Sequence, residues 1–303
     1  LQRWYDTHGR KQLPWRNTRD PYAIYISEIM LQQTQVNTVL ERYYQPFLQQ
    51  FPTIGKLAAA PERDVLKAWQ GLGYYNRASN LHEAAKTIEK ARSQRQAAGG
   101  EASHALCTHP SCPLPVASCL QTLPGVGRNT AHAVAAFAYH QPFAVMEANV
   151  KRVLCRIFSL QNPKPDALWE YATQLLDEKN PFDYNQAMMD IGSLICTRRA
   201  PKCGECPAQN ICQGKFAPEL YPAAKIKKTV PVRRKIIIVE HNEKGQYFAE
   251  PRMGKFLNGL YCFTEIDSPP PARRRLSATL RKASRVKFRT PLSRTTTSSS
   301  MRT

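Results

Sequence analysis

The sequence predicts a mainly α-helical fold with a short β-structured segment near its carboxyl end. Residues 20–36, DPYAIYISEIMLQQTQV, begin with helix-start residues, and residues 120–139, LQTLPGVGRNTAHAVAAFAY, read as two apolar helices around a tight turn. Strand-like runs joined by turn residues follow only near residue 235. We therefore expect helices to build the main body of the protein.

Length and charge restrict the class of protein. The chain has 303 residues and a net charge of +20, which favours a polyanionic partner, although residues 268–303 hold ten Lys or Arg and no acid. No apolar run approaches the ~20 residues that cross a membrane. The first residues, LQRWYDTHGRKQLPWR, show no signal peptide. We expect a cytosolic or nuclear-type protein with no membrane partner.

The helix expected from residue 20 carries a candidate acid. Asp20 suits the N-cap and Pro21 the first helical position. Glu28 shares a side with Ile24 and Leu31, and apolar surroundings would raise the pKa of its carboxyl. A surface glutamate is the alternative. The residues that follow this helix carry amides and a hydroxyl: Gln32, Gln33, Thr34 and Gln35. Such groups can form hydrogen bonds with exposed base edges.

Two loops indicate contacts with nucleic acid. In WQGLGYYNRASN, glycines at 71 and 73 loosen a loop that offers stacking aromatics, including Tyr74, and a basic residue, Arg77, that could reach a phosphate. In LPGVGRNT, Gly125 and Gly127 open a helix whose free N–H groups make a phosphate site. An ordinary connection between packed helices is the alternative for the second loop.

Cysteine spacing indicates a metal centre. Four thiols with the spacing C-x6-C-x2-C-x5-C can converge on one centre: Cys196, Cys203, Cys206 and Cys212. Spacing leaves zinc and an iron–sulfur cluster both open. A second group, Cys107, His109, Cys112 and Cys119, lies in a Pro- and Ser-rich stretch and reads better as a surface insertion. Cys155 and Cys262 lie in apolar runs, so we expect them to be buried.

Together these motifs resemble the helix–hairpin–helix DNA glycosylases that carry an iron–sulfur cluster, and within them the MutY-type adenine glycosylases. The matching stretches are LPWR (13–16), SEIMLQQTQV (27–36), GLGYYNRA (71–78), LPGVGRNT (123–130), NVKRV (149–153), NQAMMDIG (185–192) and the four cysteines. The resemblance implies a six-helix barrel module at 17–143, a cluster module at 1–16 and 144–216, and a [4Fe–4S] cofactor on Cys196, Cys203, Cys206 and Cys212.

The resemblance also implies roles for individual residues. Glu28 matches the general acid that protonates adenine, Glu147 the position that stabilises the sugar cation, and Asp190 a pocket position that assists. The implied contacts with DNA or the base are Leu13, Trp15, Arg16, Gln32, Gln33 (a wedge into the gap left by the flipped base), Tyr74, Arg77, Gly125, Val126, Gly127 and Lys151.

One motif departs from the family pattern. The family reads Asp-Gly-Asn-Val where this chain has Glu147-Ala148-Asn149-Val150, so the carboxylate moves by ~1.5 Å. We expect slow base excision, and backbone strain at Ala148 where glycine is usual. Asn129 replaces the nucleophilic lysine of bifunctional relatives, and an amide cannot form a Schiff base, so no strand cleavage is expected by that route.

The carboxyl end resembles the start of the family's Nudix-like domain, which grips 8-oxoguanine. Strands are expected at Lys235–Glu240 and Gln246–Glu250 with a turn at 242–245, after a linker at 217–229. The resemblance covers 230–267 and stops there. The low-complexity stretch 268–303 cannot bury a core, so we expect an incomplete domain and weakened 8-oxoguanine recognition, with a basic DNA-binding tail as the alternative.

The expected function is removal of adenine mispaired with 8-oxoguanine or guanine, by a monomeric, monofunctional glycosylase acting on double-stranded DNA. Its location would be the nucleoid in a bacterium, or the nucleus or mitochondrion in a eukaryote. One alternative is a catalytically silent DNA-binding iron–sulfur protein or pseudogene product. Another is a glycosylase that removes thymine, against which LPWR and Glu28 argue.

Overall fold

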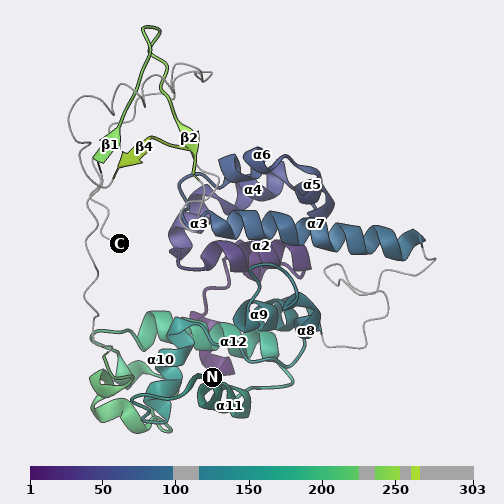
Figure 1. The fold of residues 1–303 in the computed structure, drawn as a ribbon. Helices are drawn as coiled ribbons and strands as arrows, with labels where there is room; N and C mark the ends of the chain where they lie inside the picture. The colour runs from purple at the N-terminus through teal and green to yellow at the C-terminus, as the bar shows by residue number, and fades with distance from the viewer. Residues whose placement is uncertain (98–115, 225–235, 253–260, 267–303) are drawn as a thin grey trace. The chain divides into compact units, whose positions relative to one another are not determined.

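The computed structural model describes residues 1–97, 116–224, 236–252 and 261–266. The chain divides into two units, Leu1–Lys225 and Ile226–Thr303, which are described separately. In the described residues the first unit is helical and the second contains the strands (Figure 1). The expected mainly α-helical class is confirmed.

The α-helices of the first unit are α1 (Gln2–His8), α2 (Pro21–Leu31), α3 (Val36–Arg42), α4 (Tyr44–Gln50), α5 (Ile54–Ala59), α6 (Glu62–Ala68), α7 (Asn76–Ala97), α8 (Val116–Leu120), α9 (Arg128–Tyr139), α10 (Ala148–Ile157), α11 (Pro165–Gln174) and α12 (Pro181–Asp190). Short turns of 3-10 helix are η1 (Pro14–Arg16), η3 (Cys203–Glu205), η4 (Gln213–Phe216) and η5 (Pro218–Leu220), and η2 (Ile191–Ile195) is a π-helical turn.

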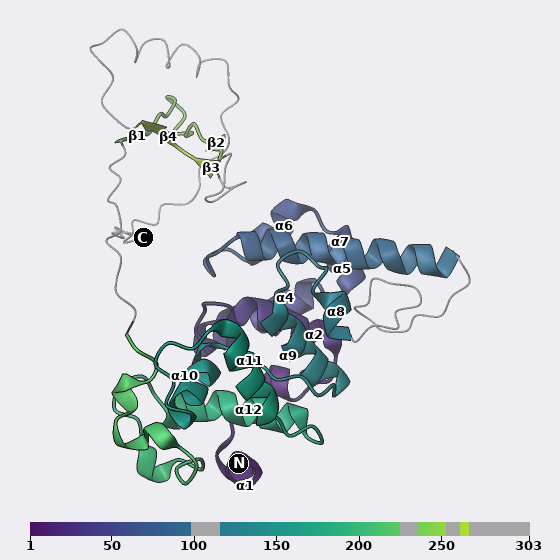
Figure 2. The same ribbon diagram turned by 60° about the horizontal axis from the view of Figure 1, so that its bottom comes forward.

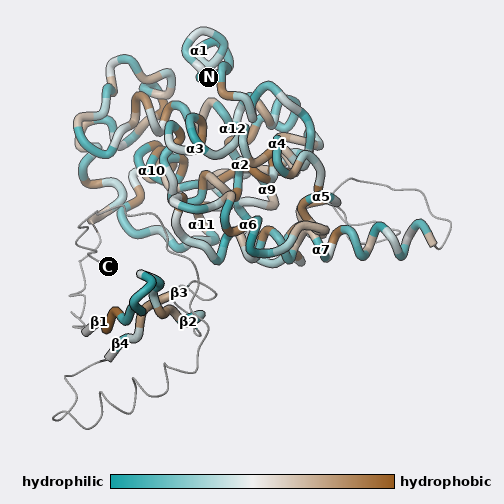
Figure 3. The backbone as a smooth tube through the Cα atoms, turned by 90° about the horizontal axis from the view of Figure 1, so that it is seen from above, coloured by the Kyte–Doolittle hydropathy of each residue, from teal (hydrophilic) through white to brown (hydrophobic). Residues whose placement is uncertain are grey.

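Helix α2 lies at the centre of the first hydrophobic core. As predicted, Asp20 caps it, because its Oδ1 accepts a hydrogen bond from Tyr22 N at 3.0 Å, and Pro21 occupies the first position. The helix packs against α9, and most of its side chains are buried. Figure 3 shows that hydrophobic residues gather around α2, whereas the residues at the protruding end of α7 are mostly hydrophilic. The core thus holds α2 rigidly.

A second hydrophobic cluster forms around α10, α11 and α12 (Figure 2). It includes Val150, Leu154, Leu168 and Met188, all buried. The amino-terminal helix α1 packs against α12, so the start of the chain joins this second cluster. These two cores resemble the two predicted modules; the module boundaries themselves stay predictions.

In residues 236–252 and 261–266, the described part of the second unit, there are four short strands: β1 (Ile236–Ile238), β2 (Glu250–Pro251), β3 (Tyr261–Cys262) and β4 (Thr264–Ile266). The predicted turn at 242–245 is present, since Gly245 N donates to Asn242 O at 3.0 Å and His241 pairs with Tyr247. Strand β1 lies within the first predicted strand, whereas β2 reaches the second only at Glu250, and β1 pairs antiparallel with β4 and β2 with β3. Backbone hydrogen bonds to distant strands compete with the local hairpin.

Several expectations fall outside the described residues: Cys107, His109 and Cys112 of the second cysteine group, and the basic stretch 268–303. Cys119 is buried in α8 and Cys155 in α10, whereas Cys262 is only half-buried. None of the helices in the described part of the chain combines the length and apolar content that crossing a bilayer needs.

Candidate active site and metal centre

A cavity of about 550 Å³ brings together residues from both cores of the first unit. Glu28 reaches it from α2, and Glu147 from the N-cap of α10. The remaining lining is Arg10, Leu13, Trp15, Arg16, Leu31, Gln32, Gln33, Thr34, Gln35, Val36, Asn129, Thr130, Ala148, Asn149, Gln186 and Met189. The two predicted acids, which lie far apart in the sequence, therefore share one cavity.

Glu28 is adapted to hold a proton near neutrality. The pKa of its carboxyl is raised to about 7, mainly by burial and also by the negative charge of Glu147, while the guanidinium of Arg16 acts in the opposite direction. Two carboxyls in electrostatic contact cannot both ionise easily. The two carboxyls therefore favour a state in which one is protonated and the other is ionised over the state in which both are ionised.

The backbone that carries Glu147 is fixed by two asparagines. Asn129 Oδ1 accepts a hydrogen bond from Met146 N at 2.7 Å, and Asn185 Oδ1 accepts one from Val145 N at 2.8 Å. Asn185 is itself buried and donates to Phe143 O and Pro181 O. Asn129 therefore positions the chain next to the acid, in the place where bifunctional relatives resembling this chain have a nucleophile.

The two carboxylate oxygens of Glu147 have different surroundings. Oε2 accepts a hydrogen bond from Asn149 Nδ2 at 3.3 Å, whereas Oε1 is buried and has no hydrogen-bond partner among the described residues. Burial raises the pKa of Glu147, and the hydrogen bonds from Asn149 and the charge of Arg152 partly offset this effect. A buried, unpaired carboxylate oxygen beside a cavity is available to a positively charged group.

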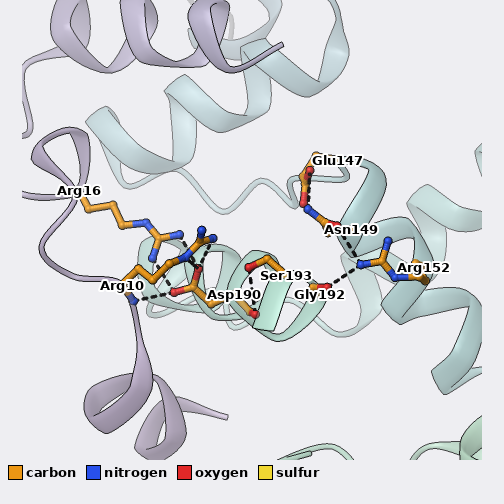
Figure 4. Close-up of polar contacts among 8 residues, drawn as sticks. All are labelled: Arg10, Arg16, Glu147, Asn149, Arg152, Asp190, Gly192 and Ser193. Atoms are coloured by element: carbon orange, nitrogen blue, oxygen red, sulfur yellow. Dashed lines mark hydrogen bonds and ion pairs between the residues drawn. The ribbon is translucent and has the colours of Figure 1, made fainter. Parts of the chain in front are cut away.

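A line of polar contacts runs from Glu147 through Asn149 and Arg152 to Gly192 (Figure 4). Asn149 Oδ1 accepts a hydrogen bond from Arg152 at 2.8 Å, and the same guanidinium donates to Gly192 O and to Cys196 O. Arg152 thus fixes the side chain that orients Glu147.

The expected strain at Ala148 is not observed. Ala148 begins α10, and it is absent from the described non-glycine residues with positive φ, which are Gln33, Tyr74, His140, Ser159 and Ala200. The first position of a helix needs only ordinary right-handed φ, which alanine adopts freely. The departure from the family motif therefore concerns the length of the acid and not the backbone.

Asp190 is buried, and its carboxylate forms ion pairs with two arginines. Its carboxylate pairs with Arg16 at 2.6 and 2.9 Å and with Arg10 at 2.7 and 2.8 Å (Figure 4). Burial alone would raise the pKa of Asp190, but the hydrogen bonds and charges of the two arginines more than offset it and lower the pKa. Asp190 therefore holds Arg16 and Arg10 at the cavity wall, and it does not line the cavity.

The expected role of Arg77 is corrected. Its guanidinium points into the protein and donates to the carbonyls of Ile29, Met30 and Gln32. Further bonds reach Thr34 Oγ1 and Gly73 O, both at 3.1 Å. These contacts use the donors that a phosphate would need. Tyr74, in contrast, is 61% exposed, as a stacking contact requires.

The hairpin has the predicted local geometry. Gly125 has φ +76°, and a Cβ there would lie 2.8 Å from Asn80 Cβ, so both conformation and space require glycine. Val126 is buried and Gly127 is the N-cap of α9 in open space. Lys151 lies in the first turn of α10 and is half-buried. The roles of these residues toward DNA stay predictions.

The four predicted cysteine ligands line one small cavity of about 20 Å³, together with Arg156, Lys202 and Lys215. Arg156 is buried and donates to Cys196 Sγ at 3.2 Å and to Thr197 O at 2.7 Å. Among the described residues, no three His, Cys, Asp or Glu side chains close around a point that fits a single metal ion. The four thiols and the three basic side chains thus line the same small cavity.

Sequence reasoning did not find Arg10, Asn185 and Gln186. Gln186 lines the cavity and its buried Oε1 has no hydrogen-bond partner. The sequence carries no local pattern that predicts the contact of Arg10 with Asp190, because the two residues are 180 positions apart in the chain.

Comparisons with known proteins identify the family of the chain. The profile of the HhH-GPD superfamily base excision DNA repair proteins matches residues 26–178. The chain therefore belongs to the HhH-GPD superfamily of base excision DNA repair proteins. Within it, the similarity is to adenine DNA glycosylases, which confirms the resemblance of the motifs.

Two such relatives show the extent of the match. The adenine DNA glycosylase of Buchnera aphidicola subsp. Baizongia pistaciae is 35% identical over 269 residues, 87% of this chain and 72% of the relative. That of Rattus norvegicus is 38% identical over 226 residues, 70% of this chain and 40% of the relative. The chain thus spans less than half the length of this mammalian relative.

Solved structures support the fold. A thermostable thymine-DNA glycosylase is 30% identical with a TM-score of 0.59, covering 71% of this chain and 93% of that one. A non-covalent endonuclease III–DNA complex, 18% identical with a TM-score of 0.55, covers 71% and 91% and shows the fold alone. The predicted helix–hairpin–helix glycosylase fold is confirmed.

Proposed function

We propose that this protein is a monofunctional adenine DNA glycosylase, which hydrolyses the N-glycosidic bond of adenine mispaired with 8-oxoguanine or guanine in double-stranded DNA. The observation that carries the proposal is the pair of carboxyls, Glu28 and Glu147, in one cavity of about 550 Å³. Cleavage of a glycosidic bond needs an acid for the leaving group and negative charge near the developing cation.

In the proposed reaction the nucleotide is rotated out of the duplex into the cavity. Glu28, whose raised pKa of about 7 keeps a protonated fraction at neutral pH, gives its proton to a ring nitrogen of adenine as the bond to the sugar C1′ breaks. Glu147 stabilises the sugar cation with its unpaired Oε1. Water then adds its hydroxyl to C1′, and the proton of that water restores Glu28.

The proposed enzyme is monofunctional because the side chain at the hairpin position is Asn129. Its Oδ1 holds Met146 N, and an amide provides no amine for a Schiff base. Product release therefore leaves an intact strand with an abasic site.

We also propose that Glu147 makes excision slow. Its carboxylate extends ~1.5 Å further than that of an aspartate, and catalytic geometry tolerates deviations of ~0.5 Å. The loss relative to an aspartate is expected to be on the order of a hundredfold. The cavity and the acid Glu28 remain in place, so the expected defect is in rate and not in binding.

The proposed cofactor is a [4Fe–4S] cluster held by Cys196, Cys203, Cys206 and Cys212. The four thiols line one cavity that Arg156, Lys202 and Lys215 surround, and positive charge suits an anionic cluster. When bound, such a cluster would tie the loop 196–212 together and supply no step of the hydrolysis. Because Arg152 contacts Cys196 O, the same loop supports Asn149 and Glu147.

A single-turnover assay tests the function. Duplexes with adenine opposite 8-oxoguanine, adenine opposite guanine, and thymine opposite guanine are incubated with excess protein, and base loss is followed after alkaline cleavage. We expect slow adenine loss that Glu28→Gln abolishes. Binding of the adenine duplexes without base loss would support a silent DNA-binding protein. Loss of thymine would support the activity named for the structural neighbour.

A further inference from the structure

We propose that Arg77 is a positioning residue, which holds the polar rim of the cavity in the shape that receives an extruded base. The inference rests on the proposed function, and it assigns to Arg77 an action inside the protein in place of a contact with DNA. The rim is the segment 32–35, whose four side chains all line the cavity.

The first step is the way in which α2 ends. The last carbonyls of a helix lack backbone donors, and two of them, Ile29 O and Met30 O, accept hydrogen bonds from Arg77 at 3.0 and 2.9 Å. A guanidinium at a helix carboxyl end also has a favourable charge. Arg77 therefore continues the function of backbone donors where the helix stops and the rim begins.

The second step is the conformation of the rim itself. Gln33 has φ +57°, a backbone conformation that residues other than glycine rarely adopt. Arg77 contacts both neighbours of this residue, Gln32 through its carbonyl and Thr34 through Oγ1. Because the two flanking residues are fixed, Gln33 cannot relax to an ordinary φ without breaking these bonds.

The third step connects a second loop. Arg77 also donates to Gly73 O and Leu72 O, and its guanidinium carbon lies 5.5 Å from the ring centroid of Tyr74. Tyr74 has φ +49° and an exposed ring. One side chain thus sets two loops, each with a residue in the left-handed region, against the end of α2.

Lysine cannot replace this arrangement. A guanidinium carries five N–H donors in a rigid fork, whereas an ammonium has three donors at one point. In Arg77→Lys some of the carbonyls of α2 and of the two loops would lose their donor, and the rim would relax. The cavity would keep Glu28 and Glu147, so the chemistry of a base already in place would not change.

The experiment uses the full chain and two readouts. Hydrogen exchange of the free protein reports whether residues 31–36 and 71–75 loosen in Arg77→Lys. The fluorescence of 2-aminopurine placed opposite guanine reports base extrusion on binding. The control is Arg92→Lys, on the same helix, where an exposed arginine pairs with Glu89 at 3.5 Å. If Arg77→Lys does not fold, Thr34→Val removes one acceptor and leaves the guanidinium.

We expect faster exchange confined to the two loops, and a population of extruded base lower by roughly tenfold or more. The pH midpoint of any base loss would be unchanged. The proposal is overturned if exchange does not change, or if exchange rises while the fluorescence gain equals that of the wild type. If the wild type itself gives neither fluorescence gain nor adenine loss, the proposed function fails, and an unchanged exchange of the loops would separately overturn the role of Arg77.

Discussion

Replacing Glu28 with glutamine should stabilise the protein, and the gain should depend on pH. The pKa of Glu28 is raised from 4.5 to about 7 in the folded state. Below pH 4.5 the carboxyl is neutral in both the folded and the unfolded state, so it costs nothing. Between pH 4.5 and 7 only the unfolded state ionises, and the free energy of unfolding falls as the pH rises.

The size of the effect follows from the same two values. A difference of about 2.5 pKa units corresponds to about 3.5 kcal/mol at ~1.4 kcal/mol per unit. Water in the cavity solvates part of the carboxylate, so this is an upper bound. The side chain of Glu28→Gln cannot ionise. The free energy of unfolding of this variant, minus that of the wild type, should therefore increase by up to about 3 kcal/mol between pH 4 and pH 8.

Urea unfolding of the wild type and of Glu28→Gln at several pH values between 4 and 8.5 measures this difference. Glu89→Gln, the same substitution at a half-buried glutamate of α7 away from the cavity, is the control. The reasoning is refuted if the Glu28→Gln difference is constant across this range, because the folded-state pKa of Glu28 would then be ordinary.

Three further predictions concern other residues. Glu147→Asp should speed adenine loss in single turnover by on the order of a hundredfold, and no gain would mean that the longer side chain is accommodated. Asp190→Asn should lower the free energy of unfolding by about 3–5 kcal/mol, because it leaves buried Arg16 without its partner; Asp6→Asn, at an exposed pair, should change it little. Cys203→Ala should lose the iron content and visible absorbance of the purified protein, whereas zinc in the wild type would contradict the cluster.

Local features of the site were predictable from the sequence. The start of α2 at Asp20 and Pro21, the positive φ of Gly125 and the placement of Glu28 on an apolar side of its helix follow from rules that act within a few residues. The prediction that Glu28 and Glu147 share one site came from the family resemblance, because hydrophobic periodicity gives no information about contacts between distant helices.

Arg77 shows where such reasoning fails. A basic residue in a glycine-loosened loop reads as a phosphate contact, but the carbonyls left free at the end of α2 lie more than forty positions away and take its donors. The sequence likewise indicated no partner for the first predicted strand, because β1 pairs with β4, which lies far along the chain. In both cases unpaired backbone groups of distant segments decided the outcome.

The central claim is that two carboxyls interact across one cavity, and a titration of Glu28 measures it most directly. Carbon-13 NMR of protein labelled at glutamate carboxyls, assigned with Glu28→Gln, gives the midpoint without any need for activity. We predict a midpoint near pH 7 that falls in Glu147→Gln, because the neighbouring negative charge is removed. A midpoint close to 4.5, or one that Glu147→Gln leaves unchanged, would contradict the account.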